Sequence, residues 1–274
     1  MPLTASTPRL SYRLEGTSGP PVLLIMGFGM SGVVWRPQVE VLRESHRVVW
    51  YDHLGVGESD PAPEWPTMAT MAADARRLLD EVGFASAHVI GVSMGGMIAQ
   101  ELALSSPSRL RSLTLIATHP GGVRACLPSP EGLLRFAQGN LGGPATRVQA
   151  LKRLLYTPEF LAGVDHEQMD RRMNDMVGKR AARATVRGHL AAVLRHRTGA
   201  RLDRVRVPTL VVRPGRDLLI SPKNSDALAR RIPGARVVRF DDAGHGITFQ
   251  CASALNGEIA RHVAAAEGQA PSPT

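Results

Sequence analysis

The sequence predicts an α/β protein with a mostly parallel, doubly wound sheet and an inserted helical segment. Three observations lead to this prediction. Short apolar runs bounded by turn residues alternate with longer helical patterns over most of the 274 residues. The motif GVSMG at 91–95 stands between a buried strand pattern and a helical pattern. The alternation stops over residues 121–201, where helical periodicity runs without an intervening strand.

Seven strands are expected, each a short apolar run ending in turn residues. They cover residues 9–15, 22–26, 47–52, 87–91, 110–117, 209–213 and 236–240. The runs RVVWYD and AHVIG are short and β-branched, as strands buried on both faces should be. Helices are expected at 33–43, 67–82, 94–105, 225–230 and 252–265. This alternation predicts βαβ units and therefore a parallel sheet.

Residues 121–201 are expected to form a helical cap, or lid, over a core built from 1–120 and 202–266. Spaced Leu, Phe and Met side chains give the segment its helical period, and Met169, Met173 and Met176 share one predicted helical face. Extra helices packed on the edge of the sheet are the alternative. The last residues, 267–274, read EGQAPSPT and are expected to be a disordered tail.

Composition argues against several classes of partner. The formal charge is +9, but only three of the 33 basic residues are lysines, and the arginines are scattered without interleaved aromatic residues. We therefore expect no nucleic acid partner. Apolar runs are far shorter than a membrane span, the N-terminus lacks a secretory pattern, and two cysteines form no framework. These features predict a cytoplasmic protein with a small-molecule substrate, no membrane partner, no cofactor and no metal.

Ser93 is the candidate nucleophile. It occupies the centre of the G-x-S-x-G motif, with HVI before it and GMIAQELAL after it. A tight strand-to-helix turn exposes the serine hydroxyl, and flanking side chains would collide there, so both outer positions are glycine. The following helix N-terminus favours developing negative charge. The motif in this context predicts nucleophilic catalysis.

His245 is the candidate base that activates this serine. It lies in the loop DDAGHG at 241–246, directly after the last expected strand. For a serine in such a turn, acid and base follow in the chain order Ser, Asp, His, which requires a histidine there. His53 and His119 follow strand ends but are expected to be structural. The remaining histidines are expected to open strands (His46, His88) or to lie on helix surfaces (His166, His189, His196, His262).

Asp217 is the candidate acid that orients His245. The strand pattern PTLVVRP runs directly into it, and it precedes His245 by 28 residues. A position after the strand that follows the nucleophile is the alternative, but LIATHPGG contains no carboxylate. Asp241 and Asp242 share the loop of His245 and are expected to shape its turn.

Two backbone N–H groups are expected to form an oxyanion hole. One belongs to Met94, immediately after the nucleophile. The other is assigned to Phe28 in the glycine-rich loop at 26–32, MGFGMSG, whose glycines let the backbone approach a substrate closely. A plain glycine-rich turn would show the same glycines.

These motifs together resemble the α/β-hydrolase superfamily. GFG at 27–29, YD at 51–52 with GVGES at 55–59, GVSMGG at 91–96, GRD at 215–217 and GH at 244–245 occur in the order of that family. The likeness covers nearly the whole chain outside the cap. Within that superfamily, the sequence is similar to the branch of small bacterial esterases, enol-lactonases, carbon–carbon bond hydrolases and cofactor-free haloperoxidases. The chain departs from the family at Met26, where histidine is common, and at 52–54, where Asp-His-Leu replaces Asp-x-Arg.

The leading hypothesis is hydrolysis of a carboxylic ester or lactone through an acyl-enzyme. Cleavage of a carbon–carbon bond and acyl transfer use the same triad and stay open, as does a ligand receptor built on this fold. The substrate pocket is expected to be mainly apolar. Met30 is expected on its floor, and Met173 and Met176 of the cap are expected in its roof, because methionine adapts to varied apolar shapes.

Overall fold

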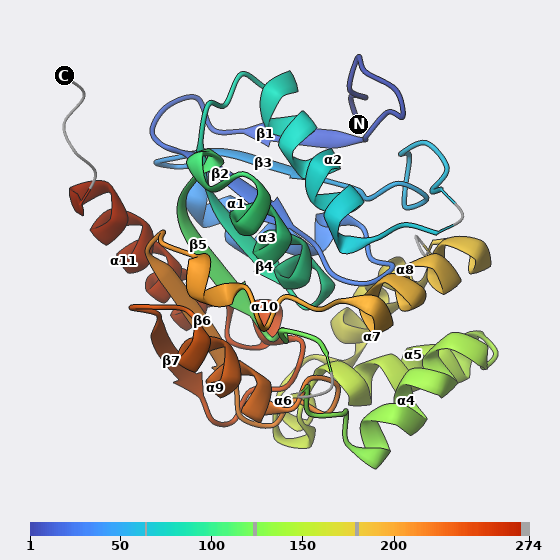
Figure 1. Ribbon diagram of the computed structural model, residues 1–274. Coiled ribbons are helices and arrows are strands. Elements are labelled where there is room, and N and C mark those ends of the chain that lie inside the picture. The colour runs from blue at the N-terminus through green and yellow to red at the C-terminus, as the bar shows by residue number, and fades with distance from the viewer. Residues whose placement is uncertain (64, 123–124, 179–180, 270–274) are drawn as a thin grey trace.

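A seven-stranded sheet forms the centre of the molecule in the computed structural model, which describes residues 1–63, 65–122, 125–178 and 181–269 (Figure 1). Its order is β1-β3-β2-β4-β5-β6-β7. The strands are β1 (Tyr12–Glu15), β2 (Pro21–Ile25), β3 (Arg47–Tyr51), β4 (Ala87–Val92), β5 (Leu110–Ile116), β6 (Thr209–Pro214) and β7 (Arg236–Phe240). β1 pairs antiparallel with β3, and the other five pairs are parallel. The predicted mostly parallel sheet is confirmed.

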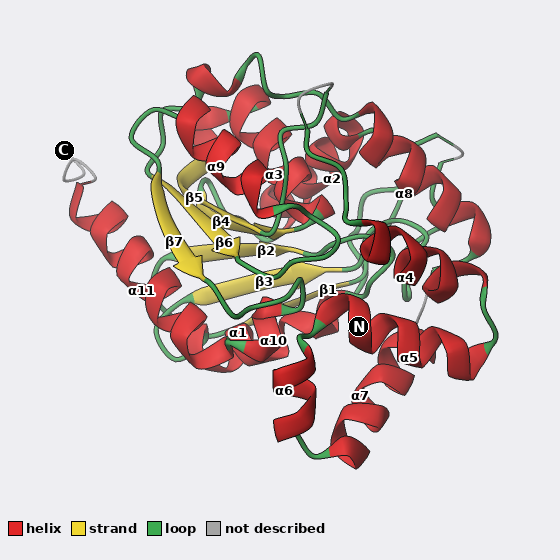
Figure 2. Ribbon diagram, turned by 90° about the horizontal axis from the view of Figure 1, so that it is seen from below, coloured by secondary structure: helices red, strands yellow, loops and turns green. Residues whose placement is uncertain are grey.

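Helices cover both faces of the sheet, so the doubly wound arrangement is also confirmed (Figure 2). One face carries α2 (Met68–Glu81), α3 (Met94–Ser105) and α9 (Pro222–Arg231). The other carries α1 (Arg36–Leu42), α10 (Ile247–Gln250) and α11 (Ala252–Gln269). Short 3₁₀ turns are η1 (Gly32–Trp35), η2 (Pro107–Arg109) and η3 (Leu202–Arg204).

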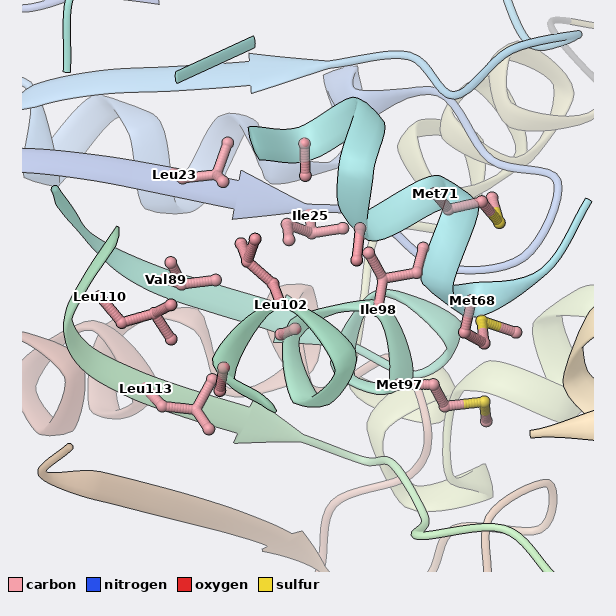
Figure 3. Close-up of a cluster of buried hydrophobic side chains, with 14 of the residues drawn as sticks. Leu23, Ile25, Met68, Met71, Val89, Met97, Ile98, Leu102, Leu110 and Leu113 are labelled. Atoms are coloured by element: carbon pink, nitrogen blue, oxygen red, sulfur yellow. The ribbon is translucent and has the colours of Figure 1, made fainter. Parts of the chain in front are cut away.

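Alternate residues of each central strand enter two different hydrophobic clusters. Leu23 and Ile25 of β2 pack toward α2 and α3, in the cluster drawn in Figure 3. Val22 and Leu24 of the same strand pack toward α1 and α11. Every residue of β2 and β4 is buried. This two-sided burial explains why these strands read as continuous apolar runs.

Between β5 and β6, the described part of the chain forms five α-helices. They are α4 (Pro130–Leu141), α5 (Pro144–Leu155), α6 (Pro158–Gly163), α7 (His166–Gly178) and α8 (Arg183–Arg195). The first three begin with proline, which is favoured at the first helical position because its fixed φ suits the helix. Figures 1 and 2 show α4 to α7 grouped at one end of the sheet.

The two ends of this insertion meet beside the sheet. Gly121 and Arg197 form an isolated antiparallel bridge. The N–H of Thr198 donates to the carbonyl of Pro120 over 2.9 Å. The insertion therefore leaves the core and returns to it at nearly the same place.

The C-terminal helix is longer than the sequence pattern predicts. α11 continues to Gln269, whereas a helix ending at 265 and a tail starting at 267 were expected. Residues 270–274 of that expected tail lie outside the described residues. Across the described chain, α11 included, the helices lack the combination of length and apolar content that crossing a membrane requires.

Candidate active site

Ser93 occupies a strained turn between β4 and α3. Its φ of 56° and ψ of −122° lie outside the regions that residues with a side chain normally adopt. The backbone holds it there, because its N–H donates to the carbonyl of Ile116 over 2.9 Å and its carbonyl accepts from the Thr118 hydroxyl over 2.7 Å. A Cβ on Gly95 would lie 2.1 Å from the carbonyl oxygen of Ile25, so the turn requires glycine there.

His245 and Asp217 form a buried hydrogen-bonded pair. Nδ1 of His245 lies 2.7 Å from Oδ2 of Asp217. The other carboxylate oxygen, Oδ1, accepts backbone N–H bonds from Leu219 and Ile220, each over 2.8 Å. The Asp217 side chain is fully buried. A carboxylate fixed in this way orients the imidazole, with Nδ1 toward the acid and Nε2 left to face a substrate.

The loops that carry this pair are joined through their backbones. The N–H of Gly215 donates to Phe240 over 2.8 Å, and the N–H of Arg216 donates to Ala243 over 2.9 Å. The other two acids of the His245 loop, Asp241 and Asp242, are exposed. Of the carboxylates weighed from the sequence, Asp217 is the one in contact with His245.

One cavity of about 120 Å³ brings Ser93 and His245 together. The glycine-rich loop after β2 lines it with Gly27, Phe28 and Met30. Most of the remaining wall is apolar: Met26, Val34, Val92, Phe136, Leu151, Leu154, Leu155, Met176 and Leu219. The described residues thus place a hydroxyl, an imidazole and a glycine-rich backbone loop around one small space.

The backbone geometry around Ser93 suits an oxyanion hole. Met94 is the first residue of α3, so its N–H has no acceptor within the helix. A Cβ on Gly27 would lie 3.2 Å from the Cβ of Ser93, which shows how closely the loop after β2 approaches the serine. Phe28 follows in that loop and lines the cavity. Two amides beside one serine can stabilise a developing oxyanion.

Two buried histidines hold the glycine-rich loop from behind. Nε2 of His53 lies 2.9 Å from the carbonyl oxygen of Met26, and Nδ1 of His189 accepts the N–H of Gly29 over 3.3 Å. Their ring centroids are 5.9 Å apart. Burial lowers the pKa of His53 to about 4 and that of His189 to about 3. Both rings are therefore neutral near pH 7. Nδ1 of His189 can accept the N–H of Gly29 only in the neutral ring, because a protonated imidazole has no free acceptor nitrogen.

These contacts correct one expectation from the sequence, the surface position of three histidines. His189 was expected on a helix surface, but it is 1% exposed, and His196 and His262 are buried as well. His53 was expected to be structural, and its contact with Met26 gives it such a role in the loop assigned to oxyanion binding. A signal for His189 was present, because Thr185, Gly188 and Ala192 share its buried face on α8.

The departures from the family pattern are accommodated by local hydrogen bonds. Oδ1 of Asp52 accepts from the Ser31 hydroxyl and from the N–H of Gly32, each over 2.7 Å. Asp52 thus holds the far end of the glycine-rich loop, while His53 holds its beginning. Met26 stands where the family commonly has histidine, and its side chain lines the cavity.

The structure separates the three methionines expected to bind substrate. Met30 and Met176 line the cavity. Met173 does not: it is fully buried in a cluster with Val148, Tyr156 and Met169 that forms the insertion's own core. The expectation for Met173 is wrong because its position on α7 turns toward α5 rather than toward Ser93. Met176, one helical turn further along, contacts both this cluster and the sheet core.

Within the described residues, no group of three or more His, Cys, Asp or Glu side chains is arranged to hold a metal ion. His119 accepts the N–H of Gly121 over 3.0 Å, so it supports the start of the insertion. Cys126 and Cys251 are free thiols at half-buried positions. Ser93 and His245 line the cavity, and Asp217 contacts His245.

Comparison with known proteins identifies relatives along nearly the whole chain. A family model described as "alpha/beta hydrolase fold" matches residues 20–250. "Putative carbamate hydrolase RutD" of Azorhizobium caulinodans is 34% identical over 87% of this chain and 89% of its own length. The protein of that name from Caulobacter vibrioides is 32% identical over the same shares.

Solved structures show the same fold. A hydrolase from Pseudomonas aeruginosa superposes with a TM-score of 0.82 and 26% identity, covering 96% of this chain and 97% of its own. A thermophilic esterase from Thermogutta terrifontis gives 0.79 and 27%, with the same coverage. The enol-lactonase from Burkholderia xenovorans gives 0.83 at 24% identity, covering 96% of this chain and all of its own.

Proposed function

The chain belongs to the α/β-hydrolase family, and from that premise we propose that it hydrolyses a carboxylic ester or lactone through an acyl-enzyme on Ser93. One observation carries the proposal. Ser93 and His245 line the same cavity, and His245 is bound to the buried carboxylate of Asp217 over 2.7 Å. A nucleophile, a base and an acid that orients the base are the parts that acyl transfer needs.

The proposed reaction proceeds in two halves. His245 Nε2 takes the proton of the Ser93 hydroxyl as its oxygen attacks the carbonyl carbon, and the amides of Phe28 and Met94 stabilise the oxyanion. The carbon–oxygen bond to the leaving alcohol breaks, and His245 returns the proton to that alcohol. Water, deprotonated by His245, then attacks the acyl group on Ser93. The acid is released, and the proton returns to the serine.

We propose that α4, α5 and α7 act as the cap of this site. Phe136 of α4, Leu151 of α5 and Met176 of α7 line the cavity that contains Ser93. The cap supplies apolar side chains, so it favours substrates with an apolar acyl part. In a lactone the leaving alcohol stays attached to the acyl group, and the same steps apply.

Carbamate hydrolysis is the second candidate. The relatives at 34% and 32% identity carry that activity in their names. A carbamate presents a carbonyl carbon between oxygen and nitrogen, and attack by Ser93 would use the same oxyanion donors and base. Carbon–carbon bond cleavage and acyl transfer also need only this triad, and no lining residue favours them over ester hydrolysis.

A substrate screen separates these reactions. Purified protein would be assayed against p-nitrophenyl esters, lactones, carbamates and β-diketones, with Ser93→Ala as the blank. We expect turnover of esters or lactones in the native protein and none in the blank. Turnover of β-diketones or carbamates alone would replace the proposed substrate class. Equal rates in the native protein and the blank would overturn the role of Ser93.

A further inference from the structure

Arg147 is a cation in the wall of the largely apolar cavity. It lies on α5, and Leu151, Leu154 and Leu155 of that helix line the same space. These positions follow Arg147 by four, seven and eight residues, so all four side chains share one helical face. The sequence therefore places arginine where a further leucine would continue the apolar stripe.

Arg147 has no ion pair with any of the residues that the structure describes. Among the described residues that line the cavity there is no Asp or Glu, and the buried Nε of Arg147 has no hydrogen-bond partner within the described chain. Three other cations of the insertion do have acidic partners: Arg135 with Glu131, Lys152 with Asp170 and Arg171 with Glu167. Arg147 as a whole is half-buried, and a partly buried cation without a counter-ion costs free energy, so its position is better explained by a ligand than by stability.

The helix itself also fails to stabilise a cation at this place. Arg147 is the fourth residue of α5, near the end where the helix dipole is positive. Cations are favoured at the opposite end, and Lys152 and Arg153 stand there. The same dipole would favour an anion bound beside Arg147.

We propose that Arg147 binds a carboxylate on the acyl part of the substrate. This inference rests on the proposed acyl transfer at Ser93 and names the substrate class for it. Guanidinium presents a planar pair of donors that matches the two oxygens of a carboxylate. The substrate is then an ester or lactone of a dicarboxylic acid, with one carboxyl group acylating Ser93 and the other bound as an anion.

The length of α5 sets the separation of the two carboxyl groups. The carbonyl of Leu155 accepts the N–H of Gly246 over 2.7 Å, so this end of α5 lies beside His245. Arg147 stands eight residues earlier, about 12 Å along the helix axis, and helical side chains lean toward the N-terminus, away from His245. The carboxylate is thus on the order of 10 Å from the scissile carbonyl, at the far end of an elongated acyl chain.

Paired substrates test this assignment. The mono-p-nitrophenyl ester of octanedioic acid would be compared with p-nitrophenyl octanoate in the native protein, Arg147→Gln, Arg147→Lys and Arg153→Gln. Arg153 is exposed on the same helix and serves as the control. We expect Arg147→Gln to lower the ratio of the two kcat/KM values, charged over neutral, by about 10- to 100-fold, the effect of one charge-assisted contact.

The two control variants sharpen the result. Lysine keeps the charge without the paired donors, so Arg147→Lys should retain part of the ratio. Arg153→Gln should retain all of it. An unchanged ratio in Arg147→Gln, or an equal loss in Arg153→Gln, would overturn the carboxylate site while leaving ester hydrolysis standing.

A binding measurement separates this inference from the proposed function. Octanedioate would be titrated into Ser93→Ala and into the double variant Ser93→Ala, Arg147→Gln by calorimetry. We expect binding to the first protein and at least a tenfold weaker affinity for the second. Failure of both esters to turn over would count against the acyl-transfer proposal, whereas equal affinities in the two variants would count against Arg147.

Discussion

The sheet core and the helical insertion contribute to the same cavity in different ways. In the core, backbone contacts hold Ser93 at a positive φ and two backbone N–H groups fix Asp217. In the insertion, a small cluster centred on Met173 orders the helices, and large apolar side chains stay exposed: Leu127, Leu133, Leu134, Leu141, Leu190 and Leu194. Reaction chemistry requires fixed geometry, whereas selectivity follows from packing that tolerates replacement.

Removing the nucleophile should produce the largest effect in the core. We expect Ser93→Ala to lower kcat by roughly a million-fold, because triad members act as one unit. The fold should persist, since the turn is held by backbone contacts and by Gly95 rather than by the serine hydroxyl. Steady-state kinetics and circular dichroism check both parts. More than about a tenth of native activity in the variant would show that another group attacks.

Replacing the orienting acid should produce the next largest effect. We expect Asp217→Asn to lower kcat by roughly ten-thousand-fold, because the amide cannot hold the imidazole in the required tautomer. Asp242→Asn is the matched control, since that side chain is exposed in the same loop as His245. If Asp242→Asn lost most of its kcat while Asp217→Asn kept nearly all of it, the acid would be assigned to the wrong residue.

The difference between the sheet core and the insertion also explains which features could be predicted from the sequence. All seven strands and the Ser93 turn follow from local rules: β-branched runs for buried strands, and glycines where a side chain would collide. The Asp217–His245 pair follows from chain order and strand ends. The strand ends and the glycines lie within a few residues of the features they predict, and chain order then selects which strand end carries the acid and which the base.

What the sequence could not predict depends on contacts between distant segments. The bond from Gly29 to His189 joins residues 160 positions apart, so no local pattern marks it. The spacing of Met173 and Met176 indicates a shared helical side, but not which neighbour each one meets. Here Met173 packs against the insertion's own cluster and Met176 reaches the cavity.

Substitution of these two methionines tests whether the insertion separates residues that stabilise it from residues that select the substrate. Met173→Ala should lower the free energy of unfolding by about 2 to 5 kcal/mol, because it leaves a hole in a fully buried cluster. Met176→Ala should destabilise less and should instead change the relative kcat/KM for acetyl, hexanoyl and bulky cyclic esters. Denaturant melts and this ester series provide the two readouts. Flat selectivity in both variants would exclude α7 from substrate recognition.

The smallest expected effect concerns the junction between core and insertion. Burial lowers the pKa of His189 from its ordinary value of 6.5 to about 3. Between these values the unfolded chain binds a proton that the folded chain does not. The free energy of unfolding therefore falls as pH falls from 6.5 toward 3, by about 1.4 kcal/mol per pH unit for this one group.

His189→Gln should remove that contribution while keeping an acceptor for the N–H of Gly29. Urea melts of native protein and variant at pH 7, 6 and 5 would measure the difference in slope. His166→Gln, at an exposed position on α7, is the control. An unchanged slope in His189→Gln would mean that this histidine is hydrated in solution and that the insertion does not close over the core.

Formation of a covalent acyl group on Ser93 would be direct evidence for nucleophilic catalysis by this serine. Native protein would be mixed with a p-nitrophenyl ester, quenched in acid during turnover and analysed by peptide mass spectrometry. We expect an added acyl mass on the peptide containing Ser93, which disappears once the substrate is exhausted. An acyl group on another side chain, or steady turnover without any acylated peptide and equally in Ser93→Ala, would contradict it.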